Sequence, residues 1–345
     1  MAADQHTRIE TGRIDRDSTW YDLYQKGIEL GTWNVEKLFD TVGVEDDVEV
    51  WNSLEPEQKE EWARLIAMFL DLEQAVAEDG RRVIEIASSP YLDDNFEKEM
   101  YAAVFTMTEV KHTQFFDMYV NTVMADVFPH NSLDVRRGGH PLPRTASCGM
   151  SDLGDRQGAL MALAAAGGDP VDIARAATAY HMSVEGIAAR AGYSMKNELM
   201  AEAPLTLLNK GFQFVSTDEG RHVTHGLELL NELLEKERAG EPEYQGVDKA
   251  IWEQALTDVR DILDTGFFIS AASGDPIEGG YVNERTAELW RGQYHEVLDL
   301  DHYDESALMD VFAESIERAE NADYDARVEA NRELYERTLA AGGGR

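Results

Sequence analysis

The segments Thr108-Glu-Val-Lys-His112 and Asp218-Glu-Gly-Arg-His222 decide how this sequence is interpreted, because each places a glutamate three residues before a histidine. Residues three apart lie on one face of an α-helix, so both side chains of each pair can point the same way. Glu73 and Glu185 precede the two pairs, 36 and 34 residues upstream of the glutamate of each pair. The similar spacings predict two helix pairs, related by pseudo-symmetry, that bring six side chains to a common centre.

The residue types suit a buried site for two metal ions. Four carboxylates carry a charge of −4, which two divalent ions neutralise; without metal the carboxylates repel one another and some take up protons. Glu73 and Glu185 lie within apolar helical sequence, where a carboxylate needs a partner. Oxygen-rich ligation with two imidazoles favours Mn and Fe over structural zinc, and Cys148 is the only cysteine. The predicted metal ligands are Glu73, Glu109, His112, Glu185, Glu219 and His222.

A single Glu-x-x-His pair would not carry this interpretation. The chain has 67 acidic residues, so one such pair would indicate no more than a solvated helix face. Two copies, each preceded at a similar distance by a glutamate in apolar sequence, are the arrangement of ferritin-like di-iron and di-manganese carboxylate proteins. The pattern therefore favours the metal site over the solvated face.

Apolar residues recur at three and four positions along most of the chain, whereas sustained alternation typical of strands is absent. We expect a polar N-terminus at 1–18, a loop at 34–53 and a connecting excursion at 129–158. The predicted class is all-α, a ferritin-like four-helix bundle with additional helices in a single domain over 19–342. The expected helices are 56–88, 93–126, 169–200, 204–236, 247–268, 283–298 and 304–341.

Composition excludes several classes of function. The 345 residues carry a net charge of −36, which repels phosphate backbones and argues against a nucleic-acid partner. The carboxylates are spread along the chain, which favours a salt-adapted surface over a site for a cationic partner. The sequence has no run of about eighteen apolar residues, no apolar N-terminal leader and no pair of cysteines, so we expect a cytoplasmic protein without a transmembrane segment.

The ordered motif of Glu73, Glu109-Val-Lys-His112, Glu185 and Asp218-Glu-Gly-Arg-His222 resembles the ribonucleotide reductase small-subunit superfamily over about residues 20 to 300. Within it, the chain is most similar to the R2-like ligand-binding oxidases. In reductase subunits proper the first ligand is usually Asp, and a radical-bearing Tyr lies one helical turn after the first His. This sequence has Glu73 and Phe116 at those positions, and a phenylalanine cannot hold a tyrosyl radical.

Val76 and Tyr180 occupy the places where these oxidases carry a Val and a Tyr joined by an ether cross-link that the metal site forms with oxygen. The offset of three residues from Glu73 puts Val76 on the metal-facing side. The offset of five residues between Tyr180 and Glu185 would swing the Tyr around an ideal helix, so its reach requires a helical distortion. Tyr193 matches a further position of that family.

The resemblance implies an Mn/Fe cofactor, with Fe/Fe as the other option, and oxygen-dependent two-electron oxidation. It also implies a bound long-chain fatty acid or similar lipid, and a homodimer. Two alternatives remain: a reductase small subunit with an Mn/Fe cofactor and a large partner, and a metal-storage or oxygen-scavenging protein. Candidate groups around the metal ligands are Asp218, Trp33, His225 and His181, of which Asp218 and Trp33 match positions that carry long-range electron transfer in reductase subunits.

Overall fold

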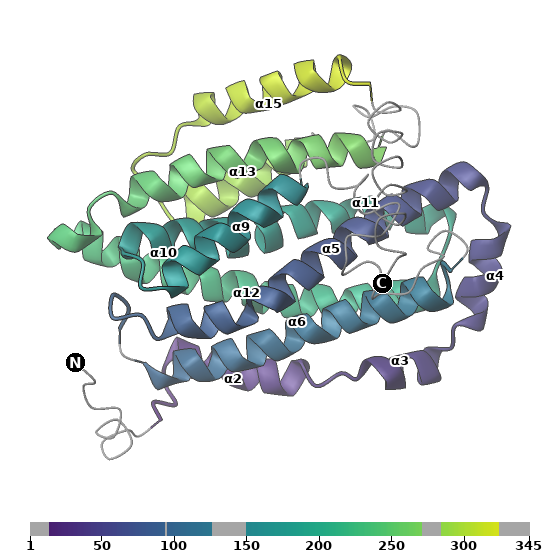
Figure 1. The fold of residues 1–345 in the computed structure, drawn as a ribbon, viewed down its shortest axis with the longest axis horizontal. Helices are drawn as coiled ribbons and strands as arrows, with labels where there is room; N and C mark the ends of the chain where they lie inside the picture. Colours follow the sequence, from purple (N-terminus) through teal and green to yellow (C-terminus); the bar gives the residue numbers. More distant parts are fainter. Residues whose placement is uncertain (1–13, 94, 126–149, 271–283, 324–345) are drawn as a thin grey trace, which may run out of the picture.

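The computed structural model describes residues 14–93, 95–125, 150–270 and 284–323, and every regular element within those ranges is helical (Figure 1). The α-helices that precede the central gap are α2 (Thr19–Leu30), α3 (Val35–Val42), α4 (Glu45–Ser53), α5 (Pro56–Ala87) and α6 (Phe96–Thr122). After it come α9 (Met150–Ala165), α10 (Pro170–Ala177), the π-helix η1 (Thr178–Ala188), α11 (Ala189–Glu202), α12 (Thr206–Arg238), the 3-10 helix η2 (Pro242–Tyr244), α13 (Val247–Ser270), α14 (Glu284–Arg291), the π-helix η4 (Gly292–Val297) and α15 (Glu305–Glu320).

Four long helical rods form the centre of the bundle. They are α5, α6, the continuous rod α10–η1–α11, and α12; α5 packs against α6, and η1 packs against α12. Helices α2 and α3 lie along one side of these rods, and α13 and α15 lie along the other (Figure 1). This is the all-α, ferritin-like class that the sequence predicts.

Local sequence signals fix where the central helices begin. Pro56 opens α5 behind a capping box formed by Glu55 and Gln58. Pro170 opens α10 behind a second capping box, in which Asp169 accepts a hydrogen bond from the backbone N–H of Asp172. These signals place both starts within one or two residues of the predicted positions.

The start of α12 is capped from a distant part of the chain. Asp47, on α4, is buried and accepts hydrogen bonds from the backbone N–H groups of Leu207 and Leu208, both at 3.1 Å. The same carboxylate accepts a hydrogen bond of 2.8 Å from the hydroxyl of Tyr119, on α6. A carboxylate at a helix N-terminus is favourable, so α4 ties together two of the rods that carry the site.

The predicted loop at 34–53 is wrong, because this stretch forms α3 and α4. Asn34 caps α3 by accepting a hydrogen bond from the backbone N–H of Lys37, and Gly43 separates the two helices with a φ of 83°. Short helices draw most of their stability from tertiary packing, here through buried residues such as Trp51. The local sequence pattern therefore did not predict these two helices.

The predicted excursion at 129–158 is also partly wrong, since α9 begins at Met150. Its remainder lies outside the described residues, as do 1–13. The predicted helix 304–341 is too long, because α15 ends at Glu320 with Asn321 as its C-cap, and the part beyond residue 323 lies outside the described residues. The limits of the predicted domain thus stay a prediction. None of the described helices is both long and apolar enough to span a membrane.

Candidate dinuclear metal centre

The structure brings all six predicted ligands together in the middle of the bundle. Among the described residues they form two overlapping groups, and within each group one potential ligand atom per residue lies within 4.8 Å of the others. All six side chains are buried, with 0–6% of their surface exposed. Glu109 and Glu219 belong to both groups, so their carboxylates could bridge two ions. The first group is Glu73, Glu109, His112 and Glu219; the second is Glu109, Glu185, Glu219 and His222.

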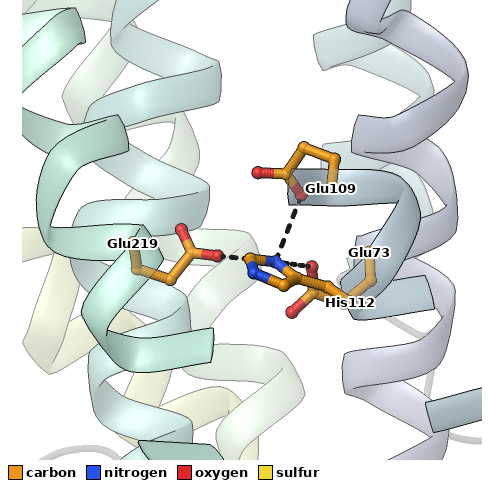
Figure 2. Close-up of side chains that lie close together, drawn as sticks. All are labelled: Glu73, Glu109, His112 and Glu219. Atoms are coloured by element: carbon orange, nitrogen blue, oxygen red, sulfur yellow. Dashed lines mark hydrogen bonds and ion pairs between the residues drawn. The ribbon is translucent and has the colours of Figure 1, made fainter. Parts of the chain in front are cut away.

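The first group surrounds the ring of His112 with carboxylates. The Nδ1 atom of His112 lies 3.1 Å from Oε2 of Glu73, 3.6 Å from Oε2 of Glu109 and 3.4 Å from Oε1 of Glu219. Figure 2 shows Glu219 approaching this ring from the opposite side to the helix that carries Glu109. The Nδ1 atom is therefore the one that could bind a metal ion.

The second group repeats this arrangement around His222. Its Nδ1 atom lies 2.6 Å from Oε1 of Glu109, 3.4 Å from Oε2 of Glu219 and 3.7 Å from Oε1 of Glu185. The two histidine rings are 5.9 Å apart between centroids. The pseudo-symmetry expected from the spacing is thus present in the positions of the ligand side chains.

The far nitrogen of each histidine is held by the residue that precedes the glutamate on the other helix. Nε2 of His112 lies 3.1 Å from Oδ2 of Asp218, and Nε2 of His222 lies 2.9 Å from Oγ1 of Thr108. Such partners fix the orientation of a metal-binding imidazole and its tautomer. Arg221 in turn donates to Asp218, which orients this carboxylate.

In the absence of metal, burial and mutual repulsion shift the pKa values of the ligand side chains away from their usual ranges. Burial raises the pKa of Glu73 to about 8 although His112 opposes it, and burial together with Glu219 and Glu109 raises the pKa of Glu185 well above its usual range. Burial acts against a charged His222, but Glu109 and Glu219 raise its pKa to about 9. The centre therefore holds protons at neutral pH that an incoming metal ion must displace.

Several buried atoms of the cluster lack the hydrogen bonds that buried polar groups normally make. Both carboxylate oxygens of Glu109, Oε1 of Glu185, Oε2 of Glu219 and Nδ1 of His222 make no hydrogen bond among the described residues, although Nδ1 of His222 lies within ion-pair distance of all three carboxylates. They come from residues of the second group and are carboxylate oxygens and an imidazole nitrogen, the donors that Fe and Mn accept. The residues present thus fit a pair of such ions.

Tyr180 reaches α5 because its helix is distorted there. It lies in the π-helix η1, whose hydrogen bonds join residues five apart, as between the N–H of Ala189 and the carbonyl of Val184. The hydroxyl of Tyr180 donates a hydrogen bond of 3.0 Å to the carbonyl oxygen of Val76. Both side chains are buried. The distortion that the five-residue offset requires is therefore present, and it sets the phenol beside Val76.

Two further aromatic residues line the metal-facing region. Phe116 is fully buried and stacks on Phe69, with 5.6 Å between centroids, at the place where reductase subunits carry a radical Tyr. Tyr193 stacks on the other side of Phe69 at 5.5 Å, and its buried hydroxyl has no hydrogen-bond partner among the described residues. Burial, and then Glu219 and Glu73, raise the pKa of Tyr193 well above its usual range.

The remaining candidates lie at different distances from the ligands. The indole N–H of Trp33 donates a hydrogen bond of 2.9 Å to Asp218, which connects it through that carboxylate to His112. His181 contacts a ligand directly, with Nδ1 2.8 Å from Oε2 of Glu185. His225 is fully buried among aromatic rings and makes no such contact with the six ligands.

Sequence reasoning missed Thr108, although the signal was present. Thr108 and Asp218 occupy the same place in the two repeats, directly before the glutamate of Glu-x-x-His. Only Asp218 drew attention, because a carboxylate is the common partner of a metal-bound histidine. Aligning the two repeats with each other would have identified the threonine.

No family model matches the chain. Among solved structures it is similar to an R2-like ligand-binding oxidase with an aerobically reconstituted Mn/Fe cofactor, at 20% identity and a TM-score of 0.60, over 94% of this chain and 97% of that one. A variant of such an oxidase with an Fe/Fe cofactor gives 21% identity and a TM-score of 0.60 over 94% and 98%. Another, anaerobically reconstituted with Mn/Fe, gives 21% and 0.62 over 86% and 96%. The chain has the fold of the R2-like ligand-binding oxidases.

Proposed function

We propose that this protein is an oxygen-dependent oxidase with a dinuclear Mn/Fe or Fe/Fe centre held by the six buried ligands. The observation that carries the proposal is the double cluster, in which Glu109 and Glu219 are shared and several donor atoms lack hydrogen bonds. The cofactors of the structural neighbours, Mn/Fe and Fe/Fe, support the choice of metals. Bound in the reduced state, such a metal pair supplies two electrons for the reduction of O2.

The chain's own groups prepare the centre for this chemistry. Asp218 and Thr108 hold the far nitrogens of the two histidines, so that Nδ1 of each ring faces inward. Phe69, Phe116 and Phe212 pack on one another in the core, and such apolar packing keeps water out of the bundle. Tyr180 is held against Val76 by its hydrogen bond, in the same core as the six ligands.

The self-processing step we propose joins Val76 to Tyr180. The phenol loses its proton, the Cβ of Val76 loses a hydrogen, and an ether bond forms between the phenol oxygen and this carbon. Two hydrogens and two electrons leave the pair of residues. Reduction of O2 to two waters takes four electrons and four protons; a reduced metal pair would supply the other two electrons, and solvent the other two protons. The hydrogen bond between Tyr180 and the backbone of Val76 supports this pairing.

The finer parts of the proposal rest on the family resemblance. We propose a long-chain fatty acid or similar lipid as the bound ligand, its carboxylate reaching the metals, and a homodimer in the cytoplasm as the working form. The neighbours are described as ligand-binding oxidases, which supports a ligand of some kind. Extraction of lipid from purified protein and its mass in solution test these two points.

Mass spectrometry tests the function. The protein is loaded with Mn and Fe and exposed to air, and a matched sample is kept anaerobic. We expect the aerobic sample to lose two hydrogens, localised to a linked pair of peptides that carry Val76 and Tyr180. Separate peptides in protein that holds both metals at full occupancy would contradict the proposal.

A second candidate, the small subunit of a ribonucleotide reductase without a tyrosyl radical, has one observation in its favour. Trp33, Asp218 and His112 are connected by hydrogen bonds of 2.9 and 3.1 Å, at positions that serve long-range electron transfer in reductase subunits. Co-purification discriminates the two. A nucleotide-binding large subunit that associates with this chain would favour the reductase, and a bound lipid would favour the oxidase.

A further inference from the structure

A buried polar cluster lies on the side of η1 that faces α13, away from the metal centre. The hydroxyl of Ser183 donates a hydrogen bond of 2.9 Å to Oδ2 of Asp258, and both residues are fully buried. Arg156, on α9, donates to Oδ1 of Asp258 at 2.9 and 3.3 Å, and Gln254 donates to the same oxygen at 2.8 Å. This carboxylate therefore connects three helical elements.

Ser183 sits between the two residues of η1 that serve the site. In an α-helix, five residues turn through about 500°, so Tyr180 and Glu185 would lie about 140° apart. The wider π-helical turn brings residues five apart close to one face. Ser183, three residues after Tyr180 and two before Glu185, then lies on another face, which agrees with its contact to α13.

The backbone of η1 is also held from a second side. Gly186 leaves a space that the side chain of Gln293, on η4, fills, because a Cβ atom at this position would collide with the amide of Gln293. A π-helical segment is a strained alternative to the α-helix and is retained where it serves a site. Contacts on its outer side are thus the means by which the fold can retain it.

Burying the Asp258 carboxylate costs free energy, which suggests that the cluster has a role other than stabilising the fold. Burial raises the pKa of Asp258 to about 6, even though Arg156, Ser183 and Gln254 all oppose that effect. Replacing such buried ion pairs by apolar groups is often neutral or stabilising. Buried polar groups of this kind can instead specify one conformation among several.

We propose that Asp258 and Ser183 are positioning residues that hold η1 in its π-helical form, and that their contact sets both Tyr180 against Val76 and Glu185 in the metal centre. The predicted effect on the cross-link rests on the proposed function, whereas the predicted effect on the π-helical form of η1 does not. Without the contact, η1 would relax toward an α-helix. Tyr180 and Glu185 would then no longer share a face.

The test compares Ser183→Ala with Ser183→Thr, which keeps the hydroxyl, and with Ser315→Ala. Ser315 is also buried, and its Oγ accepts a hydrogen bond of 3.0 Å from Arg318 on α15, remote from η1. The first readout is amide hydrogen exchange of the metal-free full chain. We expect residues 178–188 to exchange about tenfold faster in Ser183→Ala, with 206–238 unchanged. Ser183→Thr should retain most of the protection, and Ser315→Ala all of it at 178–188.

The second readout is the fraction of cross-linked peptide after loading with Mn and Fe in air. At metal concentrations that saturate both sites, we expect Ser183→Ala to form about tenfold less of the Val76–Tyr180 product than the wild-type chain. Asp258→Asn serves as a second variant if Ser183→Ala does not fold, and should show the same selective exchange.

Unchanged exchange at 178–188, or equal acceleration along the whole chain, would overturn the inference. A third outcome separates the two proposals. If residues 178–188 exchange faster in Ser183→Ala but the wild-type protein forms no cross-link, the positioning role is supported and the proposed function is rejected.

Discussion

Metal binding at neutral pH should release at least two protons. In the metal-free centre the pKa of Glu73 is raised to about 8 by burial, and that of His222 is raised to about 9 by Glu109 and Glu219 against the effect of burial. At pH 7 both groups are therefore mostly protonated. Both must be deprotonated to act as ligands, so each gives up its proton when the ions enter.

The size of the effect follows from the same two groups. Removing a proton at pH 7 costs about 1 kcal/mol where the pKa lies one above the pH, and about 3 kcal/mol where it lies two above. These two groups alone reduce the apparent metal-binding free energy by about 4 kcal/mol at pH 7, relative to pH above 9, and the raised pKa of Glu185 acts in the same direction. Because both pKa values are raised, the apparent affinity rises with pH. Below pH 8 the increase approaches ~100-fold per pH unit.

Titration calorimetry with Mn²⁺ alone measures the release, using two buffers of different ionisation enthalpy at the same pH. Glu73→Gln should lower the number of protons released by about one. Glu78→Gln, on the exposed face of the same helix, should not change it. Binding of two ions without proton release at pH 7, or an affinity that falls as the pH rises, would refute the reasoning.

Three further substitutions test separate parts of the account. Tyr180→Phe should leave both metals bound and remove any cross-linked peptide; a cross-link that persists in the mass spectrum would assign it to another residue. Thr108→Val removes the hydrogen bond to His222 and should weaken metal binding by about 10–100-fold, measured by competition with a chelator, and an unchanged affinity would deny Thr108 this role. Gly211→Ala forces a methyl group into the ring of Phe115; it should cost about 1–3 kcal/mol, and an unaltered thermal midpoint would show that the two helices can separate at no cost.

The ligand positions were predictable because both repeats are local and periodic. A Glu-x-x-His pair needs only a regular helix to present both side chains, and α6 and α12 are regular where they carry these pairs. The capping signals at Pro56 and Pro170 act within a few residues, so the helix starts were also accessible from sequence.

What the sequence did not reveal depends on contacts between distant segments. Helices α3 and α4 are short, and the role of Asp47 on α4 appears only once its carboxylate meets the start of α12. The π-helix of η1 has no residue pattern of its own, and only the five-residue offset of Tyr180 pointed to it. The partner of Ser183 lies 75 residues away, on a helix that no motif connects to the site.

Diffraction from crystals of the metal-loaded protein, recorded at the Mn and Fe absorption edges, tests the central claim most directly. The account predicts two metal ions in the bundle. One is bound by Glu73, Glu109, His112 and Glu219, and the other by Glu109, Glu185, Glu219 and His222. A single ion at full loading, or two ions bound elsewhere with these side chains paired only to one another, would contradict it.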